Sequence, residues 1–334
     1  MNLQQPFPAL VVRSAGDSAA ASVENLTLAD LPPGEVVIEV EYSSLNYKDA
    51  LASQGHPGVV RQLPHVPGID CAGRVVDSTS DDYQPGDAVL VTGYELGSPG
   101  WGGYSQYVRV PAEWVVAMPA GLTPRQAMIY GTAGFTAAQC VAALIHHGVE
   151  PSSGPVVVSG ATGGVGTLSV AILAKLGYEV TAVSGKADRH DALRELGAAE
   201  VAGRELLSAD ADRPLLKSRW AGVVDTVGGV PLATLIRSTT HRGCVAACGL
   251  TAGEQLPLTV HPFILRGVNL AGIDSAKCPR GPRMEMWRHL SGDWQVDLPD
   301  QFICEVTLDQ LPQQIESMLA SKHFGRTLVV PKIG

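Results

Sequence analysis

The sequence is poor in aromatic and charged residues. Aromatic residues make up 5% of the 334 positions and charged residues 17%, whereas hydrophobic residues make up 45% and glycine occurs 37 times. So few charges and so many apolar residues exclude an intrinsically disordered chain. The length fits two domains, or one domain with a large insertion. An aliphatic, glycine-rich composition is typical of parallel sheets and of tight turns close to cofactors.

Positive charge is also scarce. The chain has 24 Lys and Arg residues against 33 Asp and Glu residues, a formal net charge of −9. This balance argues against general binding to nucleic acid or to anionic lipid. Two uncharged stretches, 126–149 and 151–174, are long enough to cross a bilayer. Because both contain several glycines and polar residues, we expect buried core elements and no membrane span.

The six cysteines include no C-x-x-C pair, and the first ten residues, MNLQQPFPAL, have neither a basic region nor an apolar run. A disulfide framework and a secretory signal are therefore not expected. The sequence predicts a reduced, cytoplasmic protein.

The pattern of short apolar runs changes along the chain. Before Thr123, strand-like runs are separated by Pro and Gly, which predicts an antiparallel, barrel-like domain. After Thr123, a long apolar helix is followed by alternating strands and helices, which predicts a doubly wound parallel sheet. We therefore expect an α/β protein with a β-rich catalytic domain over 1–124 and 276–334 and a cofactor domain over 125–275.

A glycine-rich loop follows the strand predicted at 155–160. It reads ATGGVG and leads directly into a helix, which is the context of a dinucleotide-binding loop. The N–H groups and the dipole at the start of the helix favour phosphate binding. The loop residues expected to bind the cofactor are Thr162, Gly163, Gly164 and Val165.

The next strand ends in Ser184, Gly185 and Lys186 and lacks the acidic residue that commonly binds the ribose of NAD. A hydroxyl and an ammonium group suit a 2′-phosphate, and Arg204 offers a second cation. The sequence thus predicts NADPH as cofactor. The alternative is that Lys186 is a solvated loop lysine, and the nearby Asp188 weakens the phosphate interpretation.

Several longer stretches carry a resemblance to a known family. They are SSLNYKDAL (43–51), PGID (67–70), YGTAGFTA (130–137), SGATGGVG (159–166), AVSGK (182–186), DTVGG (225–229), GCVAACGL (243–250), PFILRGVNLAGIDS (262–275) and GRTLV (325–329). The chain resembles the medium-chain dehydrogenase/reductase superfamily, in particular its zinc-free quinone oxidoreductase branch and the acrylyl-CoA reductase group. This resemblance implies a GroES-like β-rich domain and a Rossmann domain.

Zinc-dependent members of that superfamily bind the metal through a Cys and through a His in a Gly-His-Glu segment. The corresponding places here read Ser44-Leu45-Asn46 and Gly68-Ile69-Asp70. Zinc prefers Cys and His ligands, so we expect no zinc. The resemblance implies NADPH-dependent reduction of acryloyl-CoA to propanoyl-CoA. The alternatives are a quinone or enone reductase and a regulator that holds NADPH without turnover.

Asn46, Tyr47 and Asp49 are the expected catalytic residues. Tyr47 can donate a proton or hydrogen bond and contact the cofactor, and Asn46 can position a ribose or a carbonyl group. The alternative is that Asn46 and Asp49 only cap a short helix.

The resemblance adds four expected cofactor contacts. Leu250, Ile264 and Ser275 are expected at the ends of late strands or in a loop beside the cofactor, since ligands bind at carboxyl ends of parallel strands. Arg326 is expected to reach phosphates of the cofactor or of CoA, and the alternative is an exposed tail arginine.

The segment 268–274 is apolar, with a charge only at Asp274, and should be the last strand of the cofactor domain's sheet. An open apolar edge invites pairing. We expect a homodimer that pairs two such edges, as in the related family. The rival is a monomer in which the C-terminal segment covers the edge.

Overall fold

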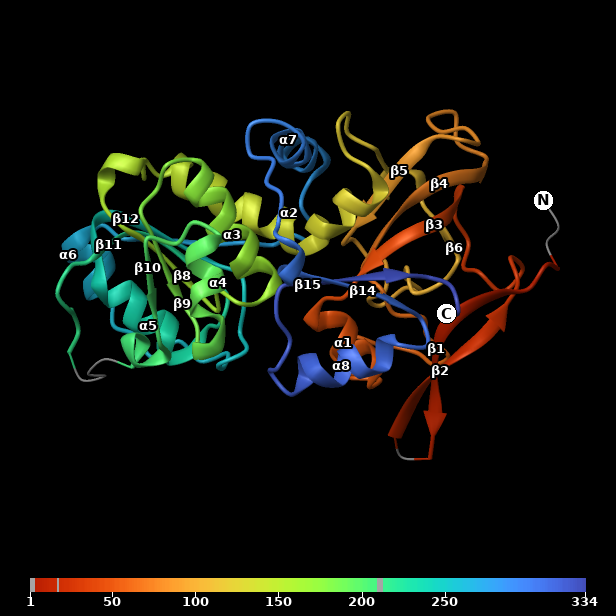
Figure 1. Cartoon of the computed structure of the whole chain (residues 1–334), viewed down its shortest axis with the longest axis horizontal. Coiled ribbons are helices and arrows are strands. Elements are labelled where there is room, and N and C mark those ends of the chain that lie inside the picture. The colour runs from red at the N-terminus through yellow and green to blue at the C-terminus, as the bar shows by residue number, and fades with distance from the viewer. Residues whose placement is uncertain (1–3, 17, 209–212) are drawn as a thin grey trace. The chain divides into compact units, whose positions relative to one another are not determined.

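The computed structural model describes residues 4–16, 18–208 and 213–334, and its chain divides into two compact units (Figure 1). Unit 1 comprises Met1–Thr132, Ala276–Met284 and Asp300–Gly334. Unit 2 comprises Ala133–Ser275 and Glu285–Pro299.

This division differs in two places from the domain boundaries expected from the sequence. The first boundary lies after Thr132 rather than after residue 124, because Gly131 interrupts the helix and Ile129 accepts a hydrogen bond from Arg326 within unit 1. The tail segment Glu285–Pro299 belongs to unit 2, where the ring of Trp287 stacks on that of Phe135 at 6.0 Å.

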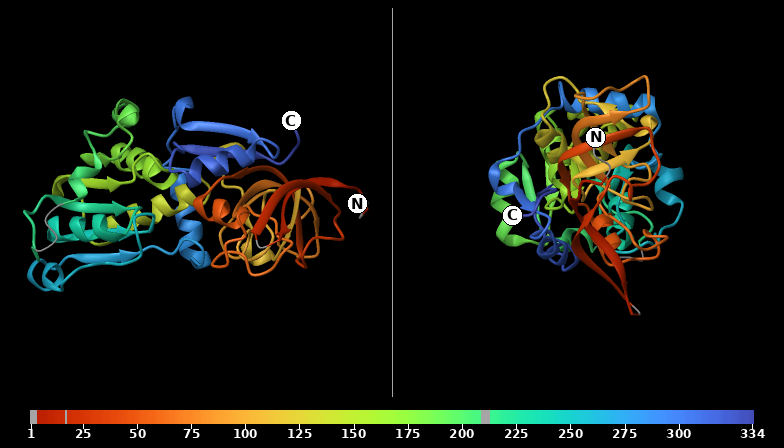
Figure 2. Two further views of the ribbon diagram at one scale, coloured as in Figure 1. Left: turned by 90° about the horizontal axis from the view of Figure 1, so that it is seen from below. Right: turned by 90° about the vertical axis from the view of Figure 1, so that its right-hand side faces the viewer.

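Unit 1 is built on a seven-stranded sheet and a hairpin. The sheet order is β14-β15-β3-β4-β5-β7, with β6 paired to β3, and all its pairs are antiparallel except β14 with β15. The outer part of the hairpin of β1 and β2 projects from this unit (Figure 2), whereas Leu10 and Val12 of β1 are buried and hydrogen-bond to Tyr104 and His65. The strands are β1 Phe7–Ala15, β2 Ser18–Leu26, β3 Val36–Ser44, β4 Asp70–Ser78, β5 Ala88–Thr92, β6 Tyr107–Val110, β7 Val116–Ala117, β14 Ile303–Thr307 and β15 Arg326–Val330.

Alternation along β3 explains the core of this unit. Val36, Ile38 and Val40 lie on one face of the strand and pack with Val89 and Val91 of β5 in one buried cluster. Two helices of this unit, α1 Tyr47–Ser53 and α8 Leu311–Leu319, pack against each other. The strongly amphipathic α8 buries Leu311 and Ile315, four residues apart on one face.

Unit 2 contains a six-stranded, fully parallel sheet in the order β10-β9-β8-β11-β12-β13. The chain starts in the middle with β8 and moves outward in both directions, which is the doubly wound arrangement expected from the sequence. The strands are β8 Val156–Ser159, β9 Val180–Val183, β10 Glu200–Ala202, β11 Trp220–Asp225, β12 Thr239–Ala247 and β13 Asn269–Gly272.

Helices connect these strands and cover the sheet. The helix α3 packs on β8 and β9, and α5 packs on β11 and β12. The central strands are buried along their whole length, as expected for a parallel sheet covered on both faces. The helices with residues in unit 2 are α2 Pro124–His146, α3 Gly164–Lys175, α4 His190–Glu195, α5 Gly229–Ser238, α6 His261–Arg266 and α7 Arg280–Leu290; α2 and α7 begin in unit 1.

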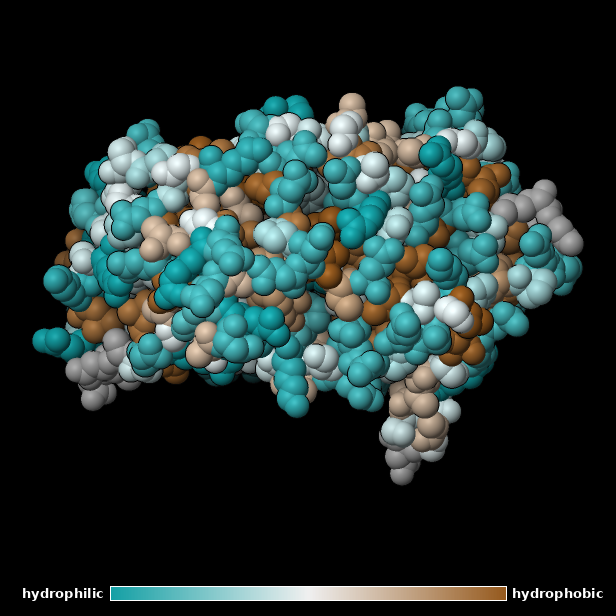
Figure 3. All heavy atoms as spheres, viewed as in Figure 1, coloured by the Kyte–Doolittle hydropathy of each residue, from teal (hydrophilic) through white to brown (hydrophobic). Residues whose placement is uncertain are grey.

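The helix α2 is the one described helix that is long and apolar enough to cross a membrane. However, 72% of its most apolar window is buried inside the protein, and Gly131 breaks it with φ 50° and ψ −153°. It is therefore a core element, as expected. On the face of the molecule drawn in Figure 3, hydrophilic side chains predominate and apolar ones appear between them.

Candidate functional site: a phosphate-binding loop in unit 2 and a polar cluster in unit 1

The glycine loop of unit 2 joins β8 to α3. Gly163 precedes the helix and provides no side-chain cap, so N–H groups of the first turn point toward the loop without a side-chain partner. At Gly166 a Cβ would lie 2.3 Å from the carbonyl oxygen of Gly160, so only glycine lets the helix begin this close to the strand. This geometry fits a pyrophosphate at the helix start.

Two predicted cofactor residues contact each other at the ends of neighbouring strands. The hydroxyl oxygens of Thr162 and Ser184 lie 2.9 Å apart, and both side chains are buried. The backbone N–H of Lys186 donates to the Ser184 hydroxyl over 3.1 Å. The loop after β8 and the turn after β9 are therefore held together.

Lys186 lies in a cluster of cations. Partial burial lowers the pKa of its ammonium group, and the nearby charges of Arg189 and Arg204 lower it further, against the effect of Asp188. The structure thus brings Lys186 and Arg204 together, as expected for a 2′-phosphate site. Arg189 joins them and was not predicted; its position six residues after the end of β9 was the available signal.

Leu250 and Ser275 follow β12 and β13 at the carboxyl edge of the sheet, where ligands are expected. Ile264 does not. It lies in α6, and Arg266 at the end of that helix donates to the carbonyl of Thr239, the first residue of β12. Ile264 is therefore in a short helix before β13, with 71% of its surface exposed, and its contact with the cofactor stays a prediction.

In unit 1, the turn after β3 starts the helix α1. Asn46 is its N-cap, and the N–H of Asn46 donates to Oδ2 of Asp49 over 2.8 Å. Tyr47 is the first helical residue, and 45% of its surface is exposed. Its phenol is thus accessible to a ligand, as a hydrogen-bond donor must be.

Asp49 has a structural role instead of the expected catalytic one. It is fully buried, and its Oδ1 accepts hydrogen bonds from the N–H groups of Gly68, at 3.1 Å, and Ile69, at 2.8 Å. Burial, helped by the charge of Asp70, raises the pKa of Asp49 to about 7. The carboxyl group fastens α1 to the loop before β4 and is not accessible to a substrate.

Asp70 is the centre of the polar cluster, which comprises Ser44, Asn46, Asp70 and Thr132. Its Oδ2 accepts from Ser44 Oγ at 2.6 Å, Asn46 Nδ2 at 2.7 Å and the Thr132 N–H at 2.8 Å. Its Oδ1 accepts from Thr132 Oγ1 at 2.6 Å. The segments 44–46 and 68–70, which correspond to the zinc-ligand positions of the zinc-dependent relatives, are therefore joined by hydrogen bonds between Asp70 and the side chains of Ser44 and Asn46.

Gly131 makes room for this cluster. Its φ is positive, and a Cβ there would lie 2.6 Å from Asp70 Oδ2 and 2.7 Å from Ser44 Oγ. The motifs PGID and YGTAGFTA contain Asp70 and Thr132, but they did not predict the role of these two residues. A polar side chain at the start of an apolar strand was the available signal.

Arg326 is neither an exposed tail residue nor placed to reach a phosphate. It is 1% exposed, and its guanidinium donates to the carbonyl groups of Ile129, at 2.8 Å, and Leu45, at 3.4 Å. Burial lowers its pKa, and the charge of Asp70 opposes this. Arg326 ties β15 to the start of α2, so the expected phosphate contact finds no support.

The polar cluster does not fit a zinc ion. Ser44 and Asp70 already use their oxygens in hydrogen bonds, and zinc prefers thiolate and imidazole ligands. Within residues 4–16, 18–208 and 213–334, no three His, Cys, Asp or Glu side chains lie close enough to hold a metal.

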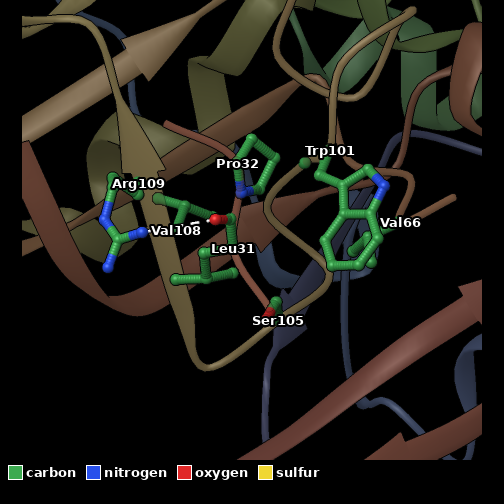
Figure 4. A pocket seen from close by; sticks show the side chains of 8 residues that line it. Leu31, Pro32, Val66, Trp101, Ser105, Val108 and Arg109 are labelled. Atoms are coloured by element: carbon green, nitrogen blue, oxygen red, sulfur yellow. Dashed lines mark hydrogen bonds between the residues drawn. The ribbon is translucent and has the colours of Figure 1, made fainter. Parts of the chain in front are cut away.

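A small pocket in unit 1 also lacks the size of a ligand site (Figure 4). Its free volume of about 10 Å³ is no larger than one water molecule needs. Arg109 on its wall donates to the carbonyls of Leu31 and Leu28, at 3.2 and 3.1 Å. We interpret it as a packing gap.

Two known protein families match the chain. The family described as "Alcohol dehydrogenase GroES-like domain" matches residues 32–120, and "Zinc-binding dehydrogenase" matches residues 164–291. These matches fall on the β-rich unit and mainly on the parallel-sheet unit, respectively.

Individual proteins match over nearly their whole length. Acrylyl-CoA reductase AcuI of Ruegeria pomeroyi is 47% identical, over 97% of this chain and 98% of its own. The solved structure of the yhdH oxidoreductase from Salmonella enterica in complex with NADP has a TM-score of 0.93 and 46% identity, and covers 98% of this chain and 100% of its own. That of Bacillus subtilis protein yhfP with NAD bound has a TM-score of 0.94, 42% identity and the same coverage. The chain belongs to the medium-chain dehydrogenase/reductase superfamily, in the group that includes the acrylyl-CoA reductases.

Proposed function

We propose that this protein is an NADPH-dependent reductase that converts acryloyl-CoA to propanoyl-CoA. The observation that carries the proposal is the end-to-end similarity to acrylyl-CoA reductase AcuI, at 47% identity. Such similarity includes both units and is not limited to the fold, which alone would not imply a function.

The residues of unit 2 support NADPH as the cofactor. The first turn of α3 suits the pyrophosphate, and Lys186 with Arg204 suits the 2′-phosphate. Among relatives of similar identity, one was solved with NADP and another with NAD. The cation cluster, rather than membership of the group, therefore carries the preference for NADPH.

When bound, NADPH supplies a hydride for the β-carbon of the substrate's double bond. Negative charge then develops on the thioester oxygen, and the α-carbon takes a proton. In our proposal the exposed phenol of Tyr47 donates a hydrogen bond to that oxygen, and solvent supplies the proton.

Asn46 has a different role because its amide orientation is fixed. Its Nδ2 donates to Asp70 at 2.7 Å and lies 3.3 Å from Asp49 Oδ2 and 3.4 Å from Ser44 Oγ. The N–H groups are thus used internally, while Oδ1 accepts a long hydrogen bond from Arg326 at 3.4 Å and, as a carbonyl oxygen, has a second lone pair for a ligand. We assign Asn46 to a hydroxyl group, such as one of a ribose, rather than to a carbonyl. No step is assigned to zinc.

We further propose that unit 1 is the catalytic domain and unit 2 the cofactor domain, in a cytoplasmic homodimer. All six cysteines are free thiols, as is usual in a reducing compartment. The strand β13 is at the edge of its sheet, with Leu270 39% exposed on it. Antiparallel pairing of two such edges would cover both.

The test is to follow NADPH consumption with acryloyl-CoA, crotonyl-CoA and a benzoquinone. We expect acryloyl-CoA to give the highest kcat/KM and propanoyl-CoA as its product. Turnover of the quinone alone would support the quinone reductase alternative. NADPH binding without turnover of any of the three would indicate a regulator.

A further inference from the structure

Gly185, two residues after the end of β9, is a glycine for reasons of space. It is not among the glycines with positive φ, so its backbone would accept other residues without strain. A Cβ, however, would lie 2.4 Å from Nε of Arg204, 2.8 Å from Cζ and 2.9 Å from Cδ. The guanidinium of Arg204 therefore rests against the bare backbone of Gly185.

The pairing of two strands brings Arg204 to this place. β10 pairs in parallel with β9, and the N–H of Ser184 donates to the carbonyl of Ala202 over 3.0 Å. The turns after both strands thus lie side by side at the carboxyl edge of the sheet. Gly185 and Lys186 come from one turn, and Arg204 comes from the other.

The charges at this edge are not balanced. Arg189 forms an ion pair with Asp188 at 3.1 Å, but among the described residues no ion pair is formed by Arg204. Burial lowers the pKa of Lys186 most, the charge of Asp188 raises it, and the charges of Arg189 and Arg204 lower it, so both arginines lie close enough to Lys186 to act on its charge. A doubly charged phosphate would relieve the repulsion among these cations.

We propose that Gly185 determines the specificity for NADPH over NADH by positioning Arg204. The missing side chain lets the guanidinium lie beside Lys186, and the two cations together bind the 2′-phosphate. Gly185 is therefore a positioning residue that acts through Arg204. This inference rests on the proposed function for the identity of the cofactor, and it does not depend on the substrate.

The test measures binding of 2′,5′-ADP and 5′-AMP to the whole protein by calorimetry. The variants are Gly185→Ala, Arg204→Ala, the double variant and, as control, Arg194→Ala, an exposed arginine paired with Asp191 on α4. Gly185→Ala and Arg204→Ala should each weaken 2′,5′-ADP at least about tenfold, the size of a lost charged hydrogen bond. Binding of 5′-AMP should be unchanged, which also shows that each variant is folded.

The double variant separates positioning from a direct effect. If Gly185 acts through Arg204, the double variant should bind 2′,5′-ADP no worse than Arg204→Ala alone. Additive losses, or an unchanged preference in Gly185→Ala, would overturn the inference. So would an unmutated protein that binds both nucleotides equally. Tight 2′,5′-ADP binding with the expected variant pattern but no turnover of acryloyl-CoA would support the inference and contradict only the proposed substrate.

Discussion

Nδ2 of Asn46 donates a hydrogen bond to Oδ2 of Asp70 over 2.7 Å, across 24 positions of sequence. The bond joins the N-cap of α1 to the first residue of β4. Because three further donors from Ser44 and Thr132 share the same carboxyl group, one side chain fixes three segments of unit 1. The consequences can be measured.

Asp70→Asn should destabilise the protein by about 2–4 kcal/mol, because the new NH2 group would face donors in a buried place. The release of Asn46 should also raise the KM for NADPH. Urea unfolding measures the first effect and steady-state kinetics the second. Asp77→Asn, at an exposed position of the same strand, is the control and should stay within about 0.5 kcal/mol of the unmutated protein. Equal stability of the two variants would contradict the central role of Asp70.

Gly131→Ala should lower the free energy of unfolding by at least about 2 kcal/mol. The substitution adds strain at positive φ and places a Cβ against Asp70 and Ser44. Gly281→Ala in α7 is the matched control, since nothing lies within 4 Å of the added Cβ. That variant should be neutral or more stable by about 0.5–1 kcal/mol. Thermal unfolding of both variants measures these changes in stability. A Gly131→Ala variant as stable as the unmutated protein would contradict the prediction.

The raised pKa of Asp49 predicts a pH dependence of stability. Between the unfolded value, 3.8, and about 7, the folded protein holds a proton on Asp49 that the unfolded chain has lost. Stability from this group is therefore fully present below pH 3.8 and falls as the pH rises to about 7, at up to about 1.4 kcal/mol per pH unit. Above that pH its contribution is constant.

Urea unfolding at several values between about pH 5 and pH 7 would measure this slope. In roughly that window, the unfolded carboxyl group has lost its proton and the folded one still holds it. Asp49→Asn removes the titrating group, so the difference in stability between the two proteins should shrink as the pH rises. Parallel curves would show that Asp49 is ionised in the folded state throughout.

The parts of this structure that depend on residues close together in the sequence could be predicted from it. The strand, the glycine loop and α3 are contiguous, so their pattern identified the phosphate-binding loop. The burial of Arg326 could not be predicted, because its partner Ile129 is 197 positions away. Asp49 likewise resembles an ordinary helix cap in sequence, while the partners that give it a structural role, Gly68 and Ile69, lie 19 and 20 positions ahead.

Leu270→Lys should shift a homodimer toward monomer. The side chain lies on the edge strand β13 and is 39% exposed, so a charge there would oppose pairing with a second edge. Light scattering at micromolar protein should report a dimer for the unmutated chain. Lys277→Glu changes the charge of a residue outside the strand and should leave the mass unchanged. A monomeric unmutated protein would exclude this assembly.

The pairing of β15 with β3 has a consequence for the order in which the chain is made. Leu328 pairs with Ser44, and the N–H of Leu45 donates to the carbonyl of Thr327. A ribosome therefore releases the edge of β3 long before its partner exists, with all of 133–275 synthesised in between. Unit 2 has its whole sheet within that interval, so it can fold first, whereas unit 1 must wait for residues 326–330. A translation product that ends before Arg326 would leave the end of β3, at Ser43 and Ser44, without its partner strand.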